Sequence, residues 1–311
     1  MDLVARAPAK VNLVLRVGRL RPDGYHDVGT LLAPLDLCDE VRVRVAPGRR
    51  GPVTCRVPGR RDLDGPRNLA ARAAEAFRLR LGVRDAVAIR IAKRIPVTAG
   101  LGGGSSDAAA VIRCLARAYR LREAAALLEV ATAVGSDVPF FLGRGPAWAT
   151  GRGERLLPVR LAPLDLVLAY PRDPALAIRA ADAYRWLDEA RGRGARRRRR
   201  LARPLDLERF RPGNDLEGPA LARLPSLAAI RGVVAGAGAL SAIMSGSGPT
   251  VVGVFASRTA ARGAAAAIRG PGAPGLEIHV ARTLQRLPGV APWRSPRSAS
   301  SPSTRRSSRP T

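Results

Sequence analysis

The feature that most constrains the fold is a glycine-rich segment between a strand pattern and a helix pattern. Val87, Ile89 and Ile91 alternate with small or charged residues, as in a half-buried strand. Four glycines then occupy the five positions 100–104, and a helical apolar face follows over residues 108–119. This order brings flexible backbone N–H groups and the positive end of a helix dipole to one point. The segment therefore predicts a phosphate cradle at the start of the helix.

The predicted cradle includes two hydroxyl groups, from Ser105 and Ser106, which suit phosphate oxygens or a bound Mg²⁺. It is not a Walker A loop, because no Gly-Lys-Ser/Thr follows, and Ser105 replaces the last glycine of G-x-G-x-x-G. The alternative is a flexible turn in which Asp107 only caps the helix. The predicted nucleotide-binding residues are Pro96, Val97, Thr98, Ala99, Gly100, Leu101, Gly102, Gly103, Gly104, Ser105 and Ser106.

Strand and helix patterns are mixed along the rest of the chain. Residues 41–45 alternate as a strand with one polar face, and the apolar runs 166–170 and 251–255 predict further strands. Residues 123–134 and 258–268 have helical periodicity. Strands that pair across hairpins, with helices grouped between them, favour an α+β fold over a doubly wound parallel sheet.

Prolines interrupt the pattern between residues 155 and 165, so we expect a domain boundary there. The first domain would span residues 1–160 and the second residues 161–287, with an arginine-rich insert at 190–203. Residues 288–311 read as a disordered Ser/Arg/Pro tail, because so little apolar surface cannot offset the entropy of ordering.

The charge balance raises the possibility of a nucleic-acid partner. Lys and Arg number 53 against 25 Asp and Glu, a formal net charge of +28, and all but two of the basic residues are arginine. Much of this charge lies at 190–203 and 294–311, where no aromatic residue is available to stack on bases. A general bias of the sequence towards Ala, Arg, Gly and Pro explains the charge without a binding role, so a nucleic-acid partner is not expected.

Cysteine usage and hydropathy bear on the compartment. Three cysteines without C-x-x-C spacing and only two histidines argue against a zinc or redox site. No signal-peptide pattern and no apolar stretch of 18 residues is present. We expect a cytoplasmic protein without a membrane partner.

Two charged residues outside the cradle are candidates for catalysis. Lys10 is one of only two lysines, and its compact charge suits a contact with a carboxylate or phosphate that guanidinium makes poorly; the alternative is a solvated surface lysine. Asp137 is followed by Val138, Pro139 and two phenylalanines, so its carboxylate could lie in a partly dry pocket and accept a proton from a hydroxyl. The alternative for Asp137 is a cap or turn former.

Taken in order, several segments closely resemble the GHMP kinase superfamily. The Arg-Pro-Asp-Gly-Tyr-His stretch points to the branch that phosphorylates a cytidyl-diphosphate erythritol in the non-mevalonate isoprenoid route. The resemblance covers about residues 3–285 and rests on segments 7–13, 21–26, 100–109, 135–141 and 245–249.

The resemblance implies a two-lobed α+β GHMP kinase fold. The N-terminal lobe would be like domain 2 of ribosomal protein S5, and the C-terminal lobe would be a smaller α+β unit. It implies ATP and Mg²⁺ as cofactors, with the γ-phosphoryl group passing to the 2-hydroxyl of the erythritol. Asp137 would be the base and Lys10 its charge partner, and the metal ligands stay unassigned apart from Ser105 or Ser106.

The resemblance also implies a set of substrate-binding residues. His26 would hydrogen-bond the cytosine edge, with Tyr25 stacking on that ring and Tyr184 on its other face. Asn12 would contact polar groups of the substrate. The partner is then a small molecule, bound by a monomer or homodimer. Two alternatives stay open: another small-molecule kinase of the superfamily, such as homoserine kinase, or an arginine-rich nucleic-acid-binding protein.

Overall fold

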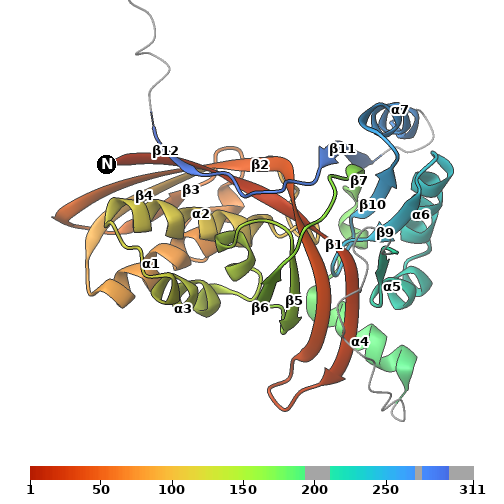
Figure 1. The fold of residues 1–311 in the computed structure, drawn as a ribbon, viewed down its shortest axis with the longest axis horizontal. Helices are drawn as coiled ribbons and strands as arrows, with labels where there is room; N and C mark the ends of the chain where they lie inside the picture. The colour runs from red at the N-terminus through yellow and green to blue at the C-terminus, as the bar shows by residue number, and fades with distance from the viewer. Residues whose placement is uncertain (193–210, 270–274, 294–311) are drawn as a thin grey trace, which may run out of the picture.

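The computed structural model describes residues 1–192, 211–269 and 275–293, which form two lobes joined by a long β-hairpin (Figure 1). The N-terminal lobe contains an eight-stranded sheet in the order β12-β1-β2-β4-β3, in which β5 also pairs with β2, β6 pairs with β5, and β8 pairs with β1. Its strands are β1 (Asp2–Leu20), β2 (His26–Arg50), β3 (Val53–Arg56), β4 (Asp85–Ala92), β5 (Ala147–Gly151), β6 (Arg155–Pro158), β8 (Gly213–Asn214) and β12 (Val290–Pro292).

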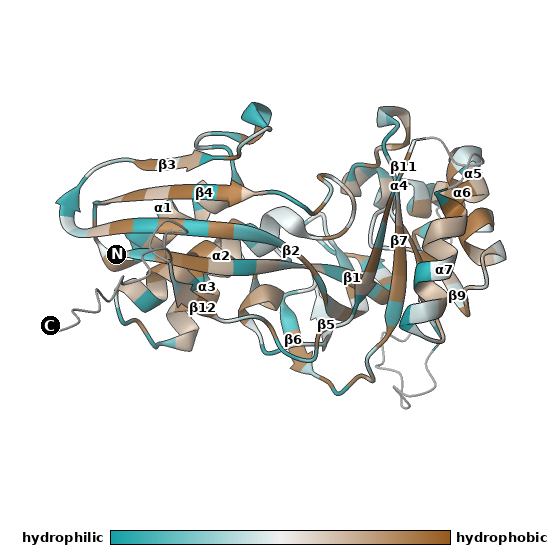
Figure 2. Cartoon of the chain, turned by 90° about the horizontal axis from the view of Figure 1, so that it is seen from above, coloured by the Kyte–Doolittle hydropathy of each residue, from teal (hydrophilic) through white to brown (hydrophobic). Residues whose placement is uncertain are grey.

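Three helices cover one face of this sheet: α1 (Leu69–Leu81), α2 (Gly103–Ala118) and α3 (Ala124–Val134) (Figure 2). The alternation in β4 explains why. Val87, Ile89 and Ile91 are buried against the helices, whereas Ala88 and Arg90 are exposed on the opposite face. One face of the sheet is therefore core, and the other is open.

The C-terminal lobe is built on a four-stranded antiparallel sheet in the order β11-β7-β10-β9. β7 (Asp165–Pro171) and β10 (Val251–Phe255) are buried along almost their whole length, as their apolar runs require. The other elements are β9 (Ser241–Met244), β11 (Leu276–Arg282), α4 (Ala180–Arg191), α5 (Glu217–Arg223), α6 (Pro225–Gly236) and α7 (Arg258–Ile268).

The β1–β2 hairpin connects the two cores. Its far end places Leu15, Val17 and Val28 in the C-terminal core, while Val11 and Leu13 pack in a third cluster with β7, β9 and β10. A strand covered on both sides buries even its polar residues. The middle of β1 is therefore a rigid element shared by both lobes, and it carries Lys10 and Asn12.

The predicted α+β class is correct, and the helices at 124–134 and 258–268 lie where periodicity placed them. The tail prediction was wrong at its start, because residues 290–292 form β12 and pair with β1. Residues 294–311 and nearly all of the 190–203 insert lie outside the described residues. Within the described ranges, no helix is long and apolar enough to cross a membrane.

Candidate active site

The glycine-rich loop enters α2 earlier than its sequence pattern suggested. The helix starts at Gly103, inside the glycine run, and Gly102 is its N-cap with φ +69°. Gly100 has φ +73°, and a Cβ there would collide with the backbone oxygens of Ser245 and Gly248. Only glycine allows the two loops to pack this closely, so their contact fixes the position of the helix N-terminus.

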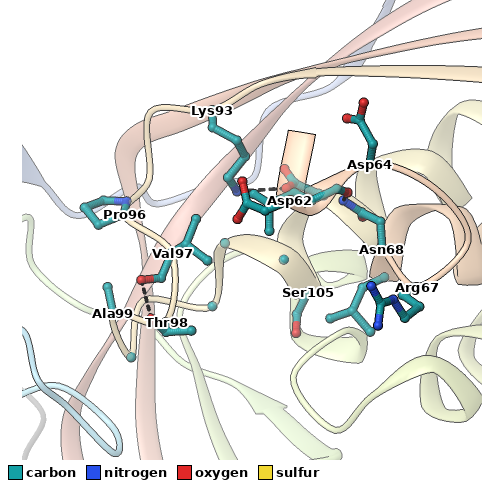
Figure 3. A pocket seen from close by; sticks show the side chains of 17 residues that line it. Asp62, Asp64, Arg67, Asn68, Lys93, Pro96, Val97, Thr98, Ala99 and Ser105 are labelled. Carbon is teal, nitrogen blue, oxygen red and sulfur yellow. Dashed lines mark hydrogen bonds and ion pairs between the residues drawn. The ribbon is translucent and has the colours of Figure 1, made fainter. Parts of the chain in front are cut away.

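The loop forms one wall of a pocket of about 390 Å³, a size suited to a small-molecule ligand. Asp62, Asp64 and Asn68 lie on the opposite side (Figure 3). Leu101 and Ser106 do not line the pocket, because both side chains are buried in the protein. The predicted binding residues that line it are Pro96, Val97, Thr98, Ala99, Gly100, Gly102, Gly103, Gly104 and Ser105.

Asp107 does not cap α2; it lies inside the helix and pairs with Lys93. The Lys93 ammonium lies 2.9 Å from Asp107 Oδ2 and 2.5 Å from Asp39 Oδ2. Burial raises the pKa of Asp107 well above its usual value, although Lys93 opposes the change. Burial lowers the pKa of Lys93, but the Asp107 and Asp39 carboxylates outweigh it, so the net shift is upward. This triad ties α2 to the sheet, and its members Lys93 and Asp107 line the pocket.

Lys10 is buried, with 5% of its surface exposed, which excludes the solvated-surface alternative. Its ammonium donates to Asn12 Oδ1 at 2.5 Å and to the Gly100 carbonyl at 3.0 Å. The pairing of β1 with β2 is irregular on both sides of residues 10–12, between Pro8 and Lys10 and again after Asn12. Such bulges re-aim side chains, and here they accompany a lysine that contacts the glycine loop.

Asp137 follows α3 and lies 3.8 Å from the Lys10 ammonium. Its neighbours Val138 and Phe140 are buried, but 40% of the Asp137 side chain is exposed, so the carboxylate is less dry than its sequence context suggested. Burial lowers the pKa of Lys10, and the Asp137 charge opposes that shift. Lys10 thus links a partly accessible carboxylate to the loop that lines the pocket.

Both polar atoms of the Asn12 side chain are hydrogen-bonded within the protein. Its Oδ1 accepts from Lys10, and its Nδ2 donates to Thr30 Oγ1 at 2.9 Å. In this structure the amide holds the Lys10 ammonium in place, and its contact with substrate stays a prediction.

Beyond Asp137, aromatic residues from both lobes come together at the end of the hairpin. The His26 and Tyr184 rings stack, with centroids 5.1 Å apart, and His26 Nε2 hydrogen-bonds Asp188 at 3.0 Å. Burial and, to a lesser degree, the charge of Asp137 raise the pKa of Tyr184 to about 12. Tyr25 is 54% exposed, beside the Arg152 guanidinium at 4.9 Å. Through Tyr184, the stacked pair lies within electrostatic range of the Asp137 carboxylate.

Comparison with known proteins places this chain in a family. Residues 68–145 match the GHMP kinases N terminal domain, and residues 194–273 match the GHMP kinases C terminal domain. A 4-diphosphocytidyl-2-C-methyl-D-erythritol kinase of Anaeromyxobacter dehalogenans is 68% identical over the whole length of both chains. The chain belongs to the GHMP kinases. An enzyme of the same description from Deinococcus radiodurans is 42% identical over 84% of this chain and 87% of its own.

Solved structures agree with this GHMP kinase assignment. A crystal structure of 4-(cytidine 5'-diphospho)-2C-methyl-D-erythritol kinase has a TM-score of 0.73 at 36% identity, covering 91% of this chain and 99% of its own. Homoserine kinase from Cytophaga hutchinsonii, at 19% identity and a TM-score of 0.66 over 93% and 96% of the two chains, shares the fold. As a GHMP kinase, the chain takes its phosphoryl group from ATP.

The donor set of this kinase fits a magnesium ion held largely by nucleotide phosphates. Among residues 1–192, 211–269 and 275–293, no group of three or more His, Cys, Asp or Glu could hold a metal. Ser105 lines the pocket and offers a hydroxyl, whereas Ser106 Oγ is buried without a hydrogen-bond partner. Oxygen ligands with phosphates completing the shell are typical of Mg²⁺.

Sequence reasoning missed several residues of the GHMP kinase site. The Asp62–Asn68 wall carries no motif that identifies it. Lys93 could have been found by the argument applied to Lys10, since it is the only other lysine. Asp188 lies 162 residues from His26, and no local pattern connects them.

Proposed function

We propose that this kinase transfers the γ-phosphoryl group of ATP to the 2-hydroxyl of 4-diphosphocytidyl-2-C-methyl-D-erythritol. The product would be the 2-phosphate in the non-mevalonate route to isoprenoid precursors. The observation that carries the proposal is the position of Lys10, which contacts the Gly100 carbonyl and Asp137 at once. A candidate base therefore lies beside the loop that lines the nucleotide pocket.

In the proposed reaction, the oxygen of the substrate 2-hydroxyl bonds to the γ-phosphorus, and Asp137 accepts the proton of that hydroxyl. The bond from that phosphorus to the β–γ bridging oxygen breaks, and ADP leaves. The Lys10 ammonium stabilises the ionised carboxylate. Phosphoryl transfer depends mainly on positioning and charge stabilisation, which this arrangement supplies.

The glycine-rich loop would bind the ATP phosphates through its backbone N–H groups at the start of α2. With Mg²⁺ bound, charge on the phosphate oxygens is neutralised, and Ser105 is the residue we assign to hold it. The wall formed by Asp62, Asp64 and Asn68 would then enclose the nucleoside end of ATP.

We assign His26, Tyr25 and Tyr184 to the cytidine end of the substrate. His26 and Tyr184 are stacked on each other, the charge of Asp137 acts on Tyr184, and Tyr25 is exposed at the hairpin tip. Aromatic faces with one polar edge are suited to a planar base.

A substrate panel tests the proposal. The purified chain would be assayed with ATP and, side by side, the cytidyl substrate, homoserine and mevalonate, with phosphorylated product detected by mass spectrometry. We expect turnover of the cytidyl substrate alone. Turnover of homoserine in its place would refute the proposed substrate while leaving the family unchanged.

A further inference from the structure

The open face of the N-terminal sheet carries a row of arginines that phosphoryl transfer does not use. Arg42 on β2 is directly opposite Arg90 on β4, and Arg90 is directly opposite Arg56 on β3. Neighbouring strands are about 4.8 Å apart, so three guanidinium groups start from one line across the sheet. This face lies opposite the helices α1, α2 and α3 (Figure 2).

The row is only partly neutralised. Arg42 pairs with Glu40 at 2.6 Å, and the adjacent Arg44 pairs with Asp2 at 2.7 Å. Within the described part of the chain, Arg56 and Arg90 have no carboxylate within ion-pair distance. Like charges placed directly opposite each other destabilise a sheet. An anion bound between them would offset this repulsion.

The row also borders a real hollow in the surface. Arg42, Arg44, Arg56 and Arg90 line a hollow of about 450 Å³, which Trp293 and the Arg44 partner Asp2 also line. The Arg42 guanidinium lies 3.4 Å from the Trp293 ring centroid, and the Trp293 backbone N–H donates to the Asp2 carbonyl at 2.9 Å. None of the residues that line this hollow lines the nucleotide pocket.

We propose that this hollow is a second anion site, which binds a diphosphate group either free or at the end of an organic molecule. Guanidinium forks bind phosphate oxygens in bidentate pairs, and their positive charge persists at any physiological pH. Glu40 already pairs with the Arg42 fork, so Arg56 and Arg90 provide the two free forks, and a diphosphate can place one phosphate group on each. Trp293 offers an aromatic surface to an organic substituent.

Calorimetric titration of the full chain with inorganic pyrophosphate tests the site. The variant Arg56→Gln/Arg90→Gln would be compared with Arg122→Gln/Arg262→Gln, which removes two exposed arginines elsewhere. Both variants keep the catalytic pocket, so pyrophosphate bound there contributes equally. We expect the first variant to bind pyrophosphate at least about tenfold more weakly at the second site, because charge-assisted hydrogen bonds are lost.

Titrating the Trp293→Ala variant with ADP and with pyrophosphate identifies the source of the diphosphate. If Trp293→Ala weakens binding of ADP at this site but not of pyrophosphate, the site takes an organic diphosphate. If it weakens neither, the site takes the free anion. Equal pyrophosphate binding by the two double variants, with both folded as judged by thermal melting, would overturn the proposal.

Discussion

Lys93 holds two buried carboxylates together at the wall of the pocket, and removing its charge provides a stringent test of how this triad stabilises the fold. Lys93→Met keeps the apolar stem but leaves Asp39 and Asp107 facing each other without a cation. Removing one partner of a buried ion pair costs about 3–5 kcal/mol. We expect a loss of this size in the free energy of unfolding, measured by urea denaturation without nucleotide at pH 8.

The same variant has a defined pH dependence. Burial already raises the pKa of Asp107, and loss of the Lys93 charge raises it further. A carboxyl whose pKa is raised in the folded state destabilises the fold when it is ionised, and this destabilisation disappears as the pH falls below the raised pKa and the group takes up a proton. The difference between Lys93→Met and the unsubstituted chain should therefore shrink between pH 8 and pH 5.

A second substitution separates the two carboxylates. Asp39 keeps backbone donors without Lys93, since Arg94 N and Ile95 N lie 2.5 and 2.9 Å from its Oδ1. Lys93→Met/Asp107→Asn should therefore be more stable than Lys93→Met alone. The reasoning would be refuted if the free energy of unfolding of Lys93→Met lay within about 1 kcal/mol of that of the unsubstituted chain, with no pH dependence of the difference, because breaking a buried ion pair must cost more than that.

Three other predictions concern the site itself. Gly100→Ala should raise the KM for ATP and destabilise the fold by at least about 1 kcal/mol, because Gly100 has a positive φ and no room for Cβ. Gly104→Ala is the control for stability only, since a Cβ there would contact only Leu69 at 3.4 Å but the residue lines the same pocket. On the alkaline side, kcat/KM should decline at a pH below the pKa of an ordinary lysine, because burial lowers the pKa of Lys10 and deprotonation removes the charge beside Asp137. A decline that begins only at or above the ordinary pKa would contradict this role of Lys10. His26→Ala should raise the KM for the cytidyl substrate and leave that for ATP unchanged, and equal effects on both would argue against cytosine contact.

Sequence periodicity predicted the helices and strands whose conformation depends on residues near one another in the sequence. The alternation in β4 and the apolar face of α2 follow from periods of two and 3.6 residues, so both were predictable. The length of the β1–β2 hairpin was not, because its middle is buried on both faces and does not alternate. The break between α5 and α6 falls at Leu224, just before Pro225, because proline is favoured in the first turn of a helix and cannot continue the preceding one.

The candidate site divides in the same way. The glycine loop is contiguous in sequence and was found as one segment, and the scarcity of lysine drew attention to Lys10. The Asp39–Lys93–Asp107 triad joins residues up to 68 positions apart, so only the folded chain reveals it. Asp188 likewise reaches His26 only because the hairpin extends to α4.

The role of Asp137 as base is the central claim, and Asp137→Asn tests it most directly. The variant keeps the size of the side chain but cannot accept the hydroxyl proton, so we expect single-turnover phosphorylation to fall by about 10²–10⁴. Binding of a non-hydrolysable ATP analogue should be unchanged, since the pocket does not include Asp137. A turnover rate like that of the unsubstituted chain would contradict the account.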